Sequence, residues 1–401
     1  MRALRVVLVA VLVLVLAAGA AFATVRPFRI AVLTAALVPE LLDRDPRILS
    51  ALVPEPQRLT FAYGADASLM DLYLPSGGGA AGELRGTARA SAGAVRGHPV
   101  VVLVLGVNPV PRDHPAVIRT AVAIARLGLA VAVPESAAVK AGEIRAADPG
   151  ALVDAFETLA GRAEIDGERI GFAGFSAGGS VALVAAADPR IAERVAYVNA
   201  FGAWADPGTF LVDIVTRSMA VGGDTLSWSP GELTRTTYLE LVLGFLEDQG
   251  MAELLRERLS PWFTGAELPG RPTFDPAIAA ALEGDARVVY ELSTAPDRAT
   301  AEAALARLSA SRATLQALSP VRVAARLRAP IYLMHDEADA AIPYSHLERL
   351  AAAVPAEALQ RVTLFALFDH VQPRSGLDPA ALPEIWKLAW HLQAVMDRAL
   401  P

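Results

Sequence analysis

Residues 169–187 read RIGFAGFSAGGSVALVAAA, and they place one serine between two apolar runs. The first run, up to Phe175, is typical of a buried strand, and the second run is typical of a buried helix. Ser176 lies at the junction, with Gly174 and Gly178 two residues away on either side. A sharp strand-to-helix turn leaves no room for larger side chains at these positions and presents the serine hydroxyl. The pattern predicts a nucleophilic serine; a small-residue turn that serves only helix packing is the alternative.

The sequence around this stretch alternates between strand-like and helix-like runs. An initial hairpin is expected at 58–64 and 69–75, and a continuous apolar run follows at 99–106. Further strands are expected at 129–135, 169–175 and 194–202, then again at 329–339 and 360–370. Helix-like runs lie at 116–127, 149–162, 178–187, 344–354 and 379–399. Continuous apolar runs are typical of strands buried on both faces of a parallel sheet. Repeated strand–helix–strand units therefore predict an α/β fold with a mostly parallel central sheet flanked by helices.

A serine hydroxyl is a weak nucleophile near neutral pH, so it needs a base that is itself held by a carboxylate. Asp339 lies just beyond the apolar run IYLMH, and His370 lies just beyond VTLFALF. Both should project from the same sheet edge as Ser176, because the carboxyl ends of parallel strands share one edge. His370 would take the hydroxyl proton, and Asp339 would orient the imidazole and stabilise its positive form. The strand-turn-Asp-x-x-x-Pro context points Asp339 to the end of the strand and favours it. The competing carboxylates are Asp336, Glu337, Asp369 and Asp206.

Polar residues crowd together in the segment His335-Asp336-Glu337-Ala338-Asp339. We expect His335 and Asp336 to be turn residues. A metal site built from this segment is the alternative, but four ligands within five residues of a turn suit no common ligand spacing. The chain has no cysteine, which excludes disulfides, thiolate zinc sites and a cysteine nucleophile. The sequence therefore predicts neither a metal nor an organic cofactor.

Several segments together resemble the α/β-hydrolases, and among them bacterial serine esterases related to the dienelactone hydrolase and acyl-peptidase groups. The segments are LMDLYLP (69–75), PVVVLVLG (99–106), GFSAGG (174–179), LSPVRVAARLRAPIYLMHDEADAAIP (318–343) and the Asp-His pair at 369–370. The resemblance implies the α/β-hydrolase fold over residues 58–203 and 319–401. It also implies Ser176, Asp339 and His370 as the catalytic triad.

The same resemblance implies an oxyanion hole made by the backbone N–H of Ala177 and a second N–H from the loop after the strand at 99–106. This loop departs from the family pattern, because it reads Leu105-Gly106-Val107-Asn108-Pro109 where many relatives read His-Gly or His-Gly-Gly. The prolines of this loop have no N–H to donate, so Val107 is the best second donor and Asn108 the next. A misplaced donor would lower the rate by about 10²- to 10³-fold, which is compatible with weak activity or an unusual substrate.

Composition limits the class of protein. The chain has 401 residues, of which 54% are hydrophobic and 20% are charged, and its formal net charge is −7. These values are ample for a large buried core and are typical of a globular protein. No lysine- or arginine-rich face stands out that would replace counterions on phosphates, so nucleic acid is not expected as a partner.

The N-terminus carries a second signal. After two arginines, residues 6–25 are uncharged and just long enough to cross roughly 30 Å of hydrocarbon. We expect residues 1–27 to be a signal peptide or a transmembrane anchor, which would make the protein membrane-anchored or exported in a bacterial cell envelope. A buried core helix is the alternative. Residues 28–57 would form a linker next to the membrane, and their apolar part, 30–42, would lie along the membrane surface or pack on the catalytic domain.

The strand–helix alternation stops between residues 204 and 318, where the pattern is mostly helical and is clearest at 237–259 and 297–318. We interpret residues 204–318 as a helical cap or lid inserted into the hydrolase domain. A lid excludes water and supplies an apolar acyl pocket. The residues that would line this pocket are Phe210, Leu211, Ile214, Val215 and Met219, although simple core packing explains them equally well.

These predictions favour a carboxylesterase- or lipase-like serine hydrolase that cleaves a small-molecule or lipid-like ester of an apolar acyl group through an acyl-enzyme. Acyl transfer or peptide cleavage would use the same triad. A non-catalytic α/β-hydrolase-fold protein that binds a ligand or a partner is the alternative from a different class. The complete set of Ser176, Asp339 and His370 argues against it, and the altered oxyanion loop argues for it.

Overall fold

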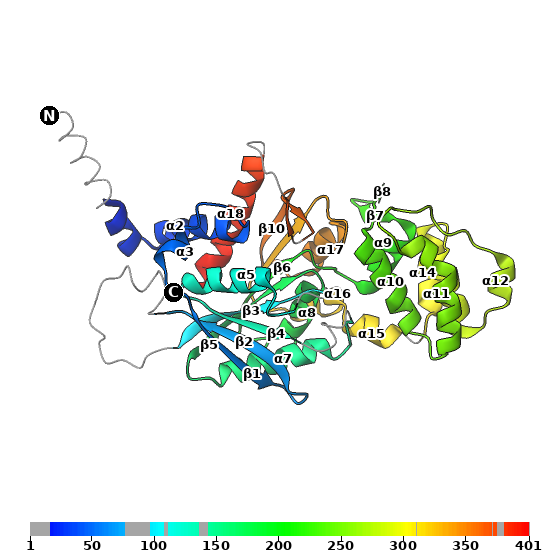
Figure 1. Ribbon diagram of the computed structural model, residues 1–401, viewed down its shortest axis with the longest axis horizontal. Coiled ribbons are helices and arrows are strands. Elements are labelled where there is room, and N and C mark those ends of the chain that lie inside the picture. The colour runs from blue at the N-terminus through cyan, green and yellow to red at the C-terminus, as the bar shows by residue number, and fades with distance from the viewer. Residues whose placement is uncertain are drawn as a thin grey trace.

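A computed structural model describes residues 17–76, 97–107, 111–135, 143–309, 311–370, 372–374 and 381–400. Its centre is an eight-stranded sheet in the order β1-β2-β4-β3-β5-β6-β9-β10 (Figure 1). The strands are β1 (Gln57–Tyr63), β2 (Ser68–Leu74), β3 (His98–Val104), β4 (Ala130–Glu135), β5 (Ile165–Phe175), β6 (Val195–Phe201), β9 (Ile331–Asp336) and β10 (Leu359–Phe365). The pairs β1–β2 and β2–β4 are antiparallel, and the remaining pairs are parallel. The predicted mostly parallel sheet is confirmed.

Helices cover both faces of the sheet, because side chains of the central strands alternate between two apolar cores. In β3, Val100 and Val102 join one core, whereas Val101 and Leu103 join the other. The first core lies under α7 (Asp148–Ala160), α8 (Ala177–Ala186) and α17 (Ser345–Ala353), and the second lies under α2 (Arg26–Leu41), α5 (Pro115–Arg126) and α18 (Leu382–Ala399). In Figure 1, α2 and α18 lie to the left of β6 and β10, whereas α8 and α17 lie to their right. All four β3 side chains are at most 3% exposed, so this strand is buried on both faces, as its continuous apolar run predicts.

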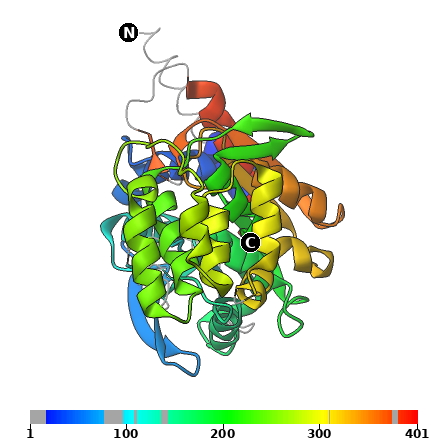
Figure 2. The ribbon, with the colours of Figure 1, turned by 90° about the vertical axis from the view of Figure 1, so that its right-hand side faces the viewer.

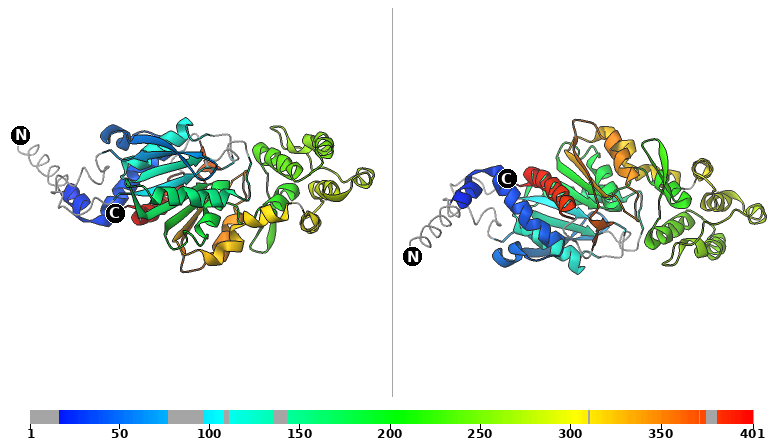
Figure 3. Two further views of the ribbon diagram at one scale, coloured as in Figure 1. Left: turned by 90° about the horizontal axis from the view of Figure 1, so that it is seen from below. Right: turned by 90° about the horizontal axis from the view of Figure 1, so that it is seen from above.

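The chain leaves the sheet after β6 and returns to it at β9, and most of the residues between form a helical body at one end of the molecule (Figures 1 and 3). Its elements are α9 (Pro207–Thr216), β7 (Ser218–Val221), β8 (Asp224–Ser227), α10 (Glu232–Gly244), α11 (Gln249–Phe263), α12 (Pro276–Ala280), α13 (Gly284–Ser293), α14 (Arg298–Arg307) and α15 (Arg312–Ala317). Apolar side chains of these helices pack into a core of their own. Figure 2 looks onto this body, which we call the insertion (residues 204–318).

Two local features of the insertion differ from the sequence prediction. Residues 237–259, expected as one helical piece, are divided between α10 and α11. Asp248 starts the second helix, because its side chain accepts a hydrogen bond from the Gly250 N–H at 2.9 Å. The β7–β8 hairpin was not predicted. Its turn consists of Gly222 and Gly223 with φ values of 59° and 97°, a conformation that favours glycine.

The N-terminal helix α2 packs on the sheet domain. Ile30, Leu33 and Leu37 are at most 3% exposed and join the core under α5 and α18. Apolar residues at this spacing share one face of a helix, which is the face that α2 buries. Of the two placements predicted for residues 30–42, packing on the domain is therefore the one observed.

Residues 1–16, which make up most of the predicted signal peptide or anchor, lie outside the described residues. Within the described part of the chain, no single helix has both the length and the apolar character that a membrane span requires. One pair of helices, Ala17–Thr24 and Arg26–Leu41, meets the length and composition test together, and the two are bent by 104° relative to each other.

Candidate active site

Ser176 occupies the turn between β5 and α8 in a backbone conformation that few residues other than glycine adopt. Its φ is 55° and its ψ is −133°, outside the regions that L-residues populate freely. A Cβ on Gly178 would lie 2.3 Å from the carbonyl oxygen of Val104, and a Cβ on Gly174 would lie 2.5 Å from the Cα of Gly179. These two glycines are therefore sterically required at the turn, as the sequence pattern indicates.

Two of the three residues predicted for the oxyanion hole line the same cavity as Ser176, namely Ala177 and Val107. Ala177 is the first residue of α8, so its N–H has no acceptor within the helix. The loop after β3 approaches the serine closely, because a Cβ on Gly106 would lie only 2.7 Å from the Ser176 Cβ. Asn108, the third predicted residue, lies outside the described residues.

Asp339 and His370 form a direct pair. His370 Nδ1 lies 2.7 Å from Asp339 Oδ2, and because a carboxylate only accepts hydrogen bonds, Nδ1 carries the proton and Nε2 is left as the basic nitrogen. The other carboxylate oxygen accepts the backbone N–H groups of Ala341 and Ile342 at 2.7 and 3.0 Å. Asp339 is 2% exposed. The pair therefore has one orientation, with both carboxylate oxygens engaged.

The electrostatic state of Asp339 follows from its surroundings. Burial alone would raise the pKa of the Asp339 carboxyl, but hydrogen bonds from His335 and His370 outweigh this effect and hold the pKa well below its ordinary value. Asp339 is therefore ionised at neutral pH, and its negative charge favours a positive imidazole at His370.

The Ser176 turn and the Asp339–His370 pair meet beside Gly202, directly after β6. The Ser176 N–H donates to the carbonyl oxygen of Phe201 at 2.7 Å. A Cβ on Gly202 would lie 3.3 Å from His370 Cε1 and 3.4 Å from Asp339 Oδ2. Ser176 and His370 line one cavity, although the hydrogen bonds of the described residues do not include one between Ser176 Oγ and the imidazole. Such bonds are often long before substrate binds and shorten in the reacting complex.

The three side chains follow three parallel strands of the sheet, β5, β9 and β10, at its carboxyl edge. A serine stands on a strained turn after β5, a carboxylate follows β9, and a histidine follows β10, in the chain order Ser, Asp, His. This is the α/β-hydrolase fold. The predicted fold class is thus confirmed by the strand order and by the position of the serine turn.

No protein-family model and no curated protein sequence matches this chain. Among solved structures, 2,6-dihydroxy-pseudo-oxynicotine hydrolase is 16% identical over 88% of this chain and 73% of its own, with a TM-score of 0.47. A puromycin hydrolase is 17% identical over 86% of this chain and 38% of its own, with a TM-score of 0.48. The acylaminoacyl peptidase of Pyrococcus horikoshii is 11% identical over 87% of this chain and 42% of its own, with a TM-score of 0.45. This chain covers about two fifths of each of the last two proteins, and the fold assignment rests on the strand order and the Ser176 turn rather than on these similarities.

The competing carboxylates have other partners or positions. Asp206 caps α9 by accepting the Thr209 N–H at 2.8 Å, and its other oxygen accepts the Ser319 hydroxyl at 2.7 Å. Glu337 is exposed, and the side chain of Asp369 lies outside the description. Of the carboxylates considered from the sequence, Asp339 is the one that the structure shows in contact with His370.

The prediction that His335 and Asp336 are turn residues is wrong, because both belong to β9 and are at most 1% exposed. Asp336 Oδ2 accepts the N–H groups of Leu367 and Phe368, both at 2.7 Å, and so anchors the segment that leads to His370. His335 Nε2 lies 2.9 Å from the carbonyl oxygen of Ile342, so it carries a proton. The same nitrogen lies 3.3 Å from Asp339 Oδ2, so His335 is a second imidazole in contact with the Asp339 carboxylate. Sequence reasoning missed this contact.

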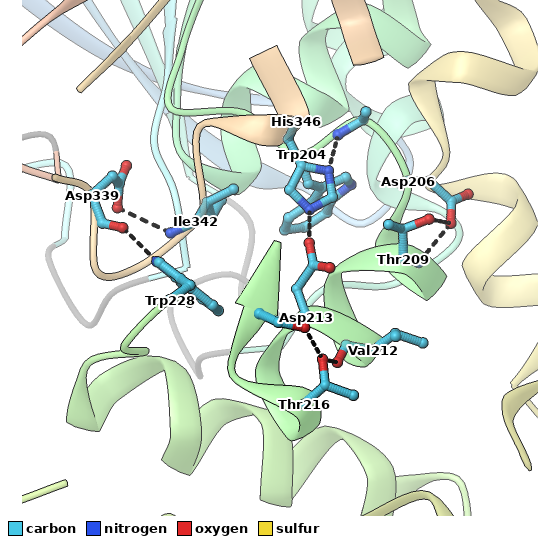
Figure 4. A network of polar contacts seen from close by, with 12 residues as sticks. Trp204, Asp206, Thr209, Val212, Asp213, Thr216, Trp228, Asp339, Ile342 and His346 are labelled. Carbon is cyan, nitrogen blue, oxygen red and sulfur yellow. Dashed lines mark hydrogen bonds and ion pairs between the residues drawn. The ribbon is translucent and has the colours of Figure 1, made fainter. Parts of the chain in front are cut away.

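The insertion contacts the loop that carries Asp339 (Figure 4). The indole N–H of Trp228 donates to the carbonyl oxygen of Asp339 at 2.8 Å, and the Gly231 N–H donates to that of Ala340 at 2.7 Å. Both donors belong to the segment between β8 and α10. This segment is far from Asp339 in the sequence, so the sequence alone does not reveal the two contacts. The insertion thus helps to hold the acid loop in place.

A buried contact between a histidine and a carboxylate also joins the insertion to the sheet domain (Figure 4). His346 of α17 accepts the Ala205 N–H on Nδ1 at 3.1 Å, and its Nε2 lies 3.2 Å from Asp213 Oδ2 of α9. Asp213 also pairs with Arg298 of α14 at 2.5 Å. The histidine and the aspartate are at most 1% exposed, so this contact is sheltered from water.

The cavity at Ser176 has a volume of about 1470 Å³ and is lined by both the sheet domain and the insertion. Of the five predicted pocket residues, Phe210, Leu211 and Ile214 line it, whereas Val215 and Met219 belong to the core of the insertion. Over the described ranges, no group of three or more His, Asp or Glu side chains has an arrangement that could hold a metal ion.

Proposed function

We propose that this protein is a serine hydrolase that cleaves a carboxylic ester through an acyl-enzyme intermediate. Ser176 is the nucleophile, His370 the general base and acid, and Asp339 the carboxylate that orients and stabilises the imidazolium. The observation that carries this proposal is the 2.7 Å contact between His370 Nδ1 and Asp339, which leaves Nε2 free on the cavity that Ser176 shares. A binding protein has no need of a strained serine next to such a pair.

In the proposed reaction, His370 Nε2 takes the Ser176 hydroxyl proton while Oγ forms a bond to the ester carbonyl carbon. The carbonyl oxygen becomes negative, and the N–H groups of Ala177 and Val107 are the donors proposed to stabilise it. His370 then gives the proton to the alcohol oxygen as the ester C–O bond breaks. Water removes the acyl group from Ser176 by the same steps, with His370 again acting first as base and then as acid. Asp339 stays ionised throughout, as its lowered pKa requires.

We further propose that the substrate is a small-molecule or lipid-like ester with an apolar acyl group and that the N-terminal segment serves in export or membrane anchoring. The support for an apolar substrate is the lining of the cavity, to which the insertion contributes Phe210, Leu211 and Ile214. The support for the membrane or envelope location is the uncharged stretch at 6–25. The packed helix α2 would then hold the domain close to that stretch.

A fluorophosphonate probe tests the proposal, because it reacts with a serine only when a neighbouring base activates it. We expect labelling of the wild-type protein and none of Ser176→Ala. The matched control is Ser180→Ala, since Ser180 is also near the start of α8 but its hydroxyl donates to the Trp204 carbonyl oxygen at 3.0 Å. Failure of the folded wild-type protein to react would favour a ligand-binding function. A panel of p-nitrophenyl esters and the matching anilides then separates ester from amide cleavage.

A further inference from the structure

The cavity at Ser176 and His370 extends in two directions. One part runs into the insertion, and the other runs along the sheet face that α2 covers. We call the second part the α2 chamber. Its walls include Leu37 and Leu41 of α2, Leu103 of β3, Ala173 of β5, and Leu392 and Met396 of α18.

The α2 chamber exists because the central strand β5 carries small residues on this face. Ala173 is in register with Leu103 on one side and Asn199 on the other. Two residues earlier, a Cβ on Gly171 would lie 2.3 Å from the ring of Tyr197, so that ring fills the level below. Ala173 keeps some exposed surface although strands flank it and helices cover the sheet. That surface therefore faces the internal cavity.

The side chain of Asn199, a buried polar group at the wall of the α2 chamber, is hydrogen-bonded within the protein. Asn199 Oδ1 lies 2.9 Å from His391 Nε2, and His391 Nδ1 lies 2.8 Å from the hydroxyl of Thr363. Burial lowers the pKa of His391 to about 3, so the ring is neutral. Charged lining residues lie toward the end of α2, where Asp43 and Arg119 are 3.5 Å apart. The interior of the chamber is thus apolar, and its charges are at the rim.

The part of the cavity inside the insertion has a mixed lining. Its walls include the apolar residues Phe210, Leu211 and Ile214, and also Thr236, Thr237, Glu240, Gln249 and Arg256. Arg256 pairs with Glu240 at 2.7 Å, so polar groups face this space beside the apolar ones. A substrate that spans both parts at Ser176 can therefore place polar groups in the insertion, whereas the α2 chamber is lined mainly by apolar side chains.

We propose that the α2 chamber binds the apolar chain of an amphiphilic ester, while the polar remainder of the substrate lies in the insertion. This proposal deepens the proposed function, and its covalent step rests on that function, but chain binding does not. From Phe175 to Ala173, above the Tyr197 ring, the strand covers roughly 7 Å at about 3.3 Å per residue. That length holds an extended chain of about five methylene groups, because each C–C bond of such a chain advances it by roughly 1.3 Å.

The first test fills the chamber with Ala173→Leu and compares p-nitrophenyl hexanoate with p-nitrophenyl acetate. The added carbons displace about three methylene groups, each worth about fourfold in binding. We expect the ratio of kcat/KM for hexanoate to that for acetate to fall on the order of 50-fold. The matched control is Ala351→Leu on α17, a partly buried alanine outside the cavity lining, which should leave the ratio unchanged. If Ala173→Leu does not fold, Ala173→Val suits a strand and should lower the ratio by a smaller factor.

The second test needs no hydrolysis. Hexanoic acid is titrated by isothermal titration calorimetry into the Ser176→Ala variant, and then into the same variant carrying Ala173→Leu. We expect saturable binding by the first protein and at least tenfold weaker binding by the second. Binding that depends on residue 173 without hydrolysis of any ester would support the chamber and overturn the proposed function. If the protein hydrolyses esters but Ala173→Leu changes neither the chain-length ratio nor probe binding, the α2 chamber does not bind the chain. The proposed function then still stands.

Discussion

Replacing Asp339 by asparagine tests the orientation of the catalytic base. One carboxylate oxygen accepts two backbone N–H groups, from Ala341 and Ile342, so the amide oxygen of Asp339→Asn must take that place. The amide NH₂ then faces the two imidazoles. His370 Nδ1 would have to accept from this NH₂, which moves the ring proton to Nε2 and removes the base. His335 Nε2–H, which lies 3.3 Å from Asp339 Oδ2, would face a second donor.

The expected magnitude follows from this change of tautomer. In a Ser-His-Asp triad the corresponding substitution lowers kcat by about 10⁴-fold, or about 5.4 kcal/mol in the barrier. We expect a loss of this size for p-nitrophenyl acetate at pH 7, with a much smaller change in KM. The matched control is Asp206→Asn, because asparagine caps a helix as well as aspartate does and Asp206 caps α9. Its kcat should stay within about twofold of the wild-type value.

The assay measures kcat and KM for the wild-type protein and both variants at a temperature where all three are folded by circular dichroism. The rate of fluorophosphonate labelling should follow the same order. If Asp339→Asn keeps more than about a tenth of the wild-type kcat, the carboxylate that orients His370 is not Asp339. A severe loss of kcat in Asp206→Asn would instead indicate that Asp206, which follows β6, is the carboxylate that orients His370.

Three further predictions concern the elements around this pair. Gly178→Ala should lower the free energy of unfolding by about 3 kcal/mol or more, since its Cβ would lie 2.3 Å from the Val104 carbonyl oxygen; Gly150→Ala, with nothing within 4 Å of its Cβ, should be neutral or stabilising in urea titrations. His335→Ala should lower kcat about tenfold through loss of one charge-assisted hydrogen bond to Asp339, with partial recovery in His335→Gln; an unchanged kcat would show that His335 does not position the acid. Because the pKa of Asp339 is lower in the folded protein, the unfolded chain takes up the proton first as pH falls below about 4. The free energy of unfolding should therefore decrease as pH falls from that point toward the folded-state pKa, and the decrease should be smaller in Asp339→Asn.

Much of the sheet and of the site was predictable because the signals are local. The continuous apolar run in β3 predicts a strand buried on both faces, and both faces are buried. The glycines around Ser176 predict a sharp turn, and the clashes at Gly174 and Gly178 give its steric cause. In both cases neighbouring residues along the chain carry the constraint, so no distant contact is needed to read it.

Other features depend on partners that are distant in sequence. His335 and Asp336 follow an apolar run and resemble turn residues, but parallel pairing with Leu364 and Phe365 of β10 extends β9 through them. The second imidazole on Asp339 was missed for this reason. Likewise, contact between Trp228 and the acid loop depends on the insertion being folded over that edge.

The sequence by itself determined most strands and helices of the sheet domain, where the strained serine turn lies, and the order of serine, acid and histidine along the chain. The tertiary structure alone decided which carboxylate contacts His370, how the insertion contacts the acid loop, and that a cavity runs from Ser176 along the sheet under α2. The physical reason is the range of the interactions. Backbone propensity and turn sterics act between near neighbours, whereas ion pairs, cavities and oriented hydrogen bonds arise only when segments far apart in sequence pack together.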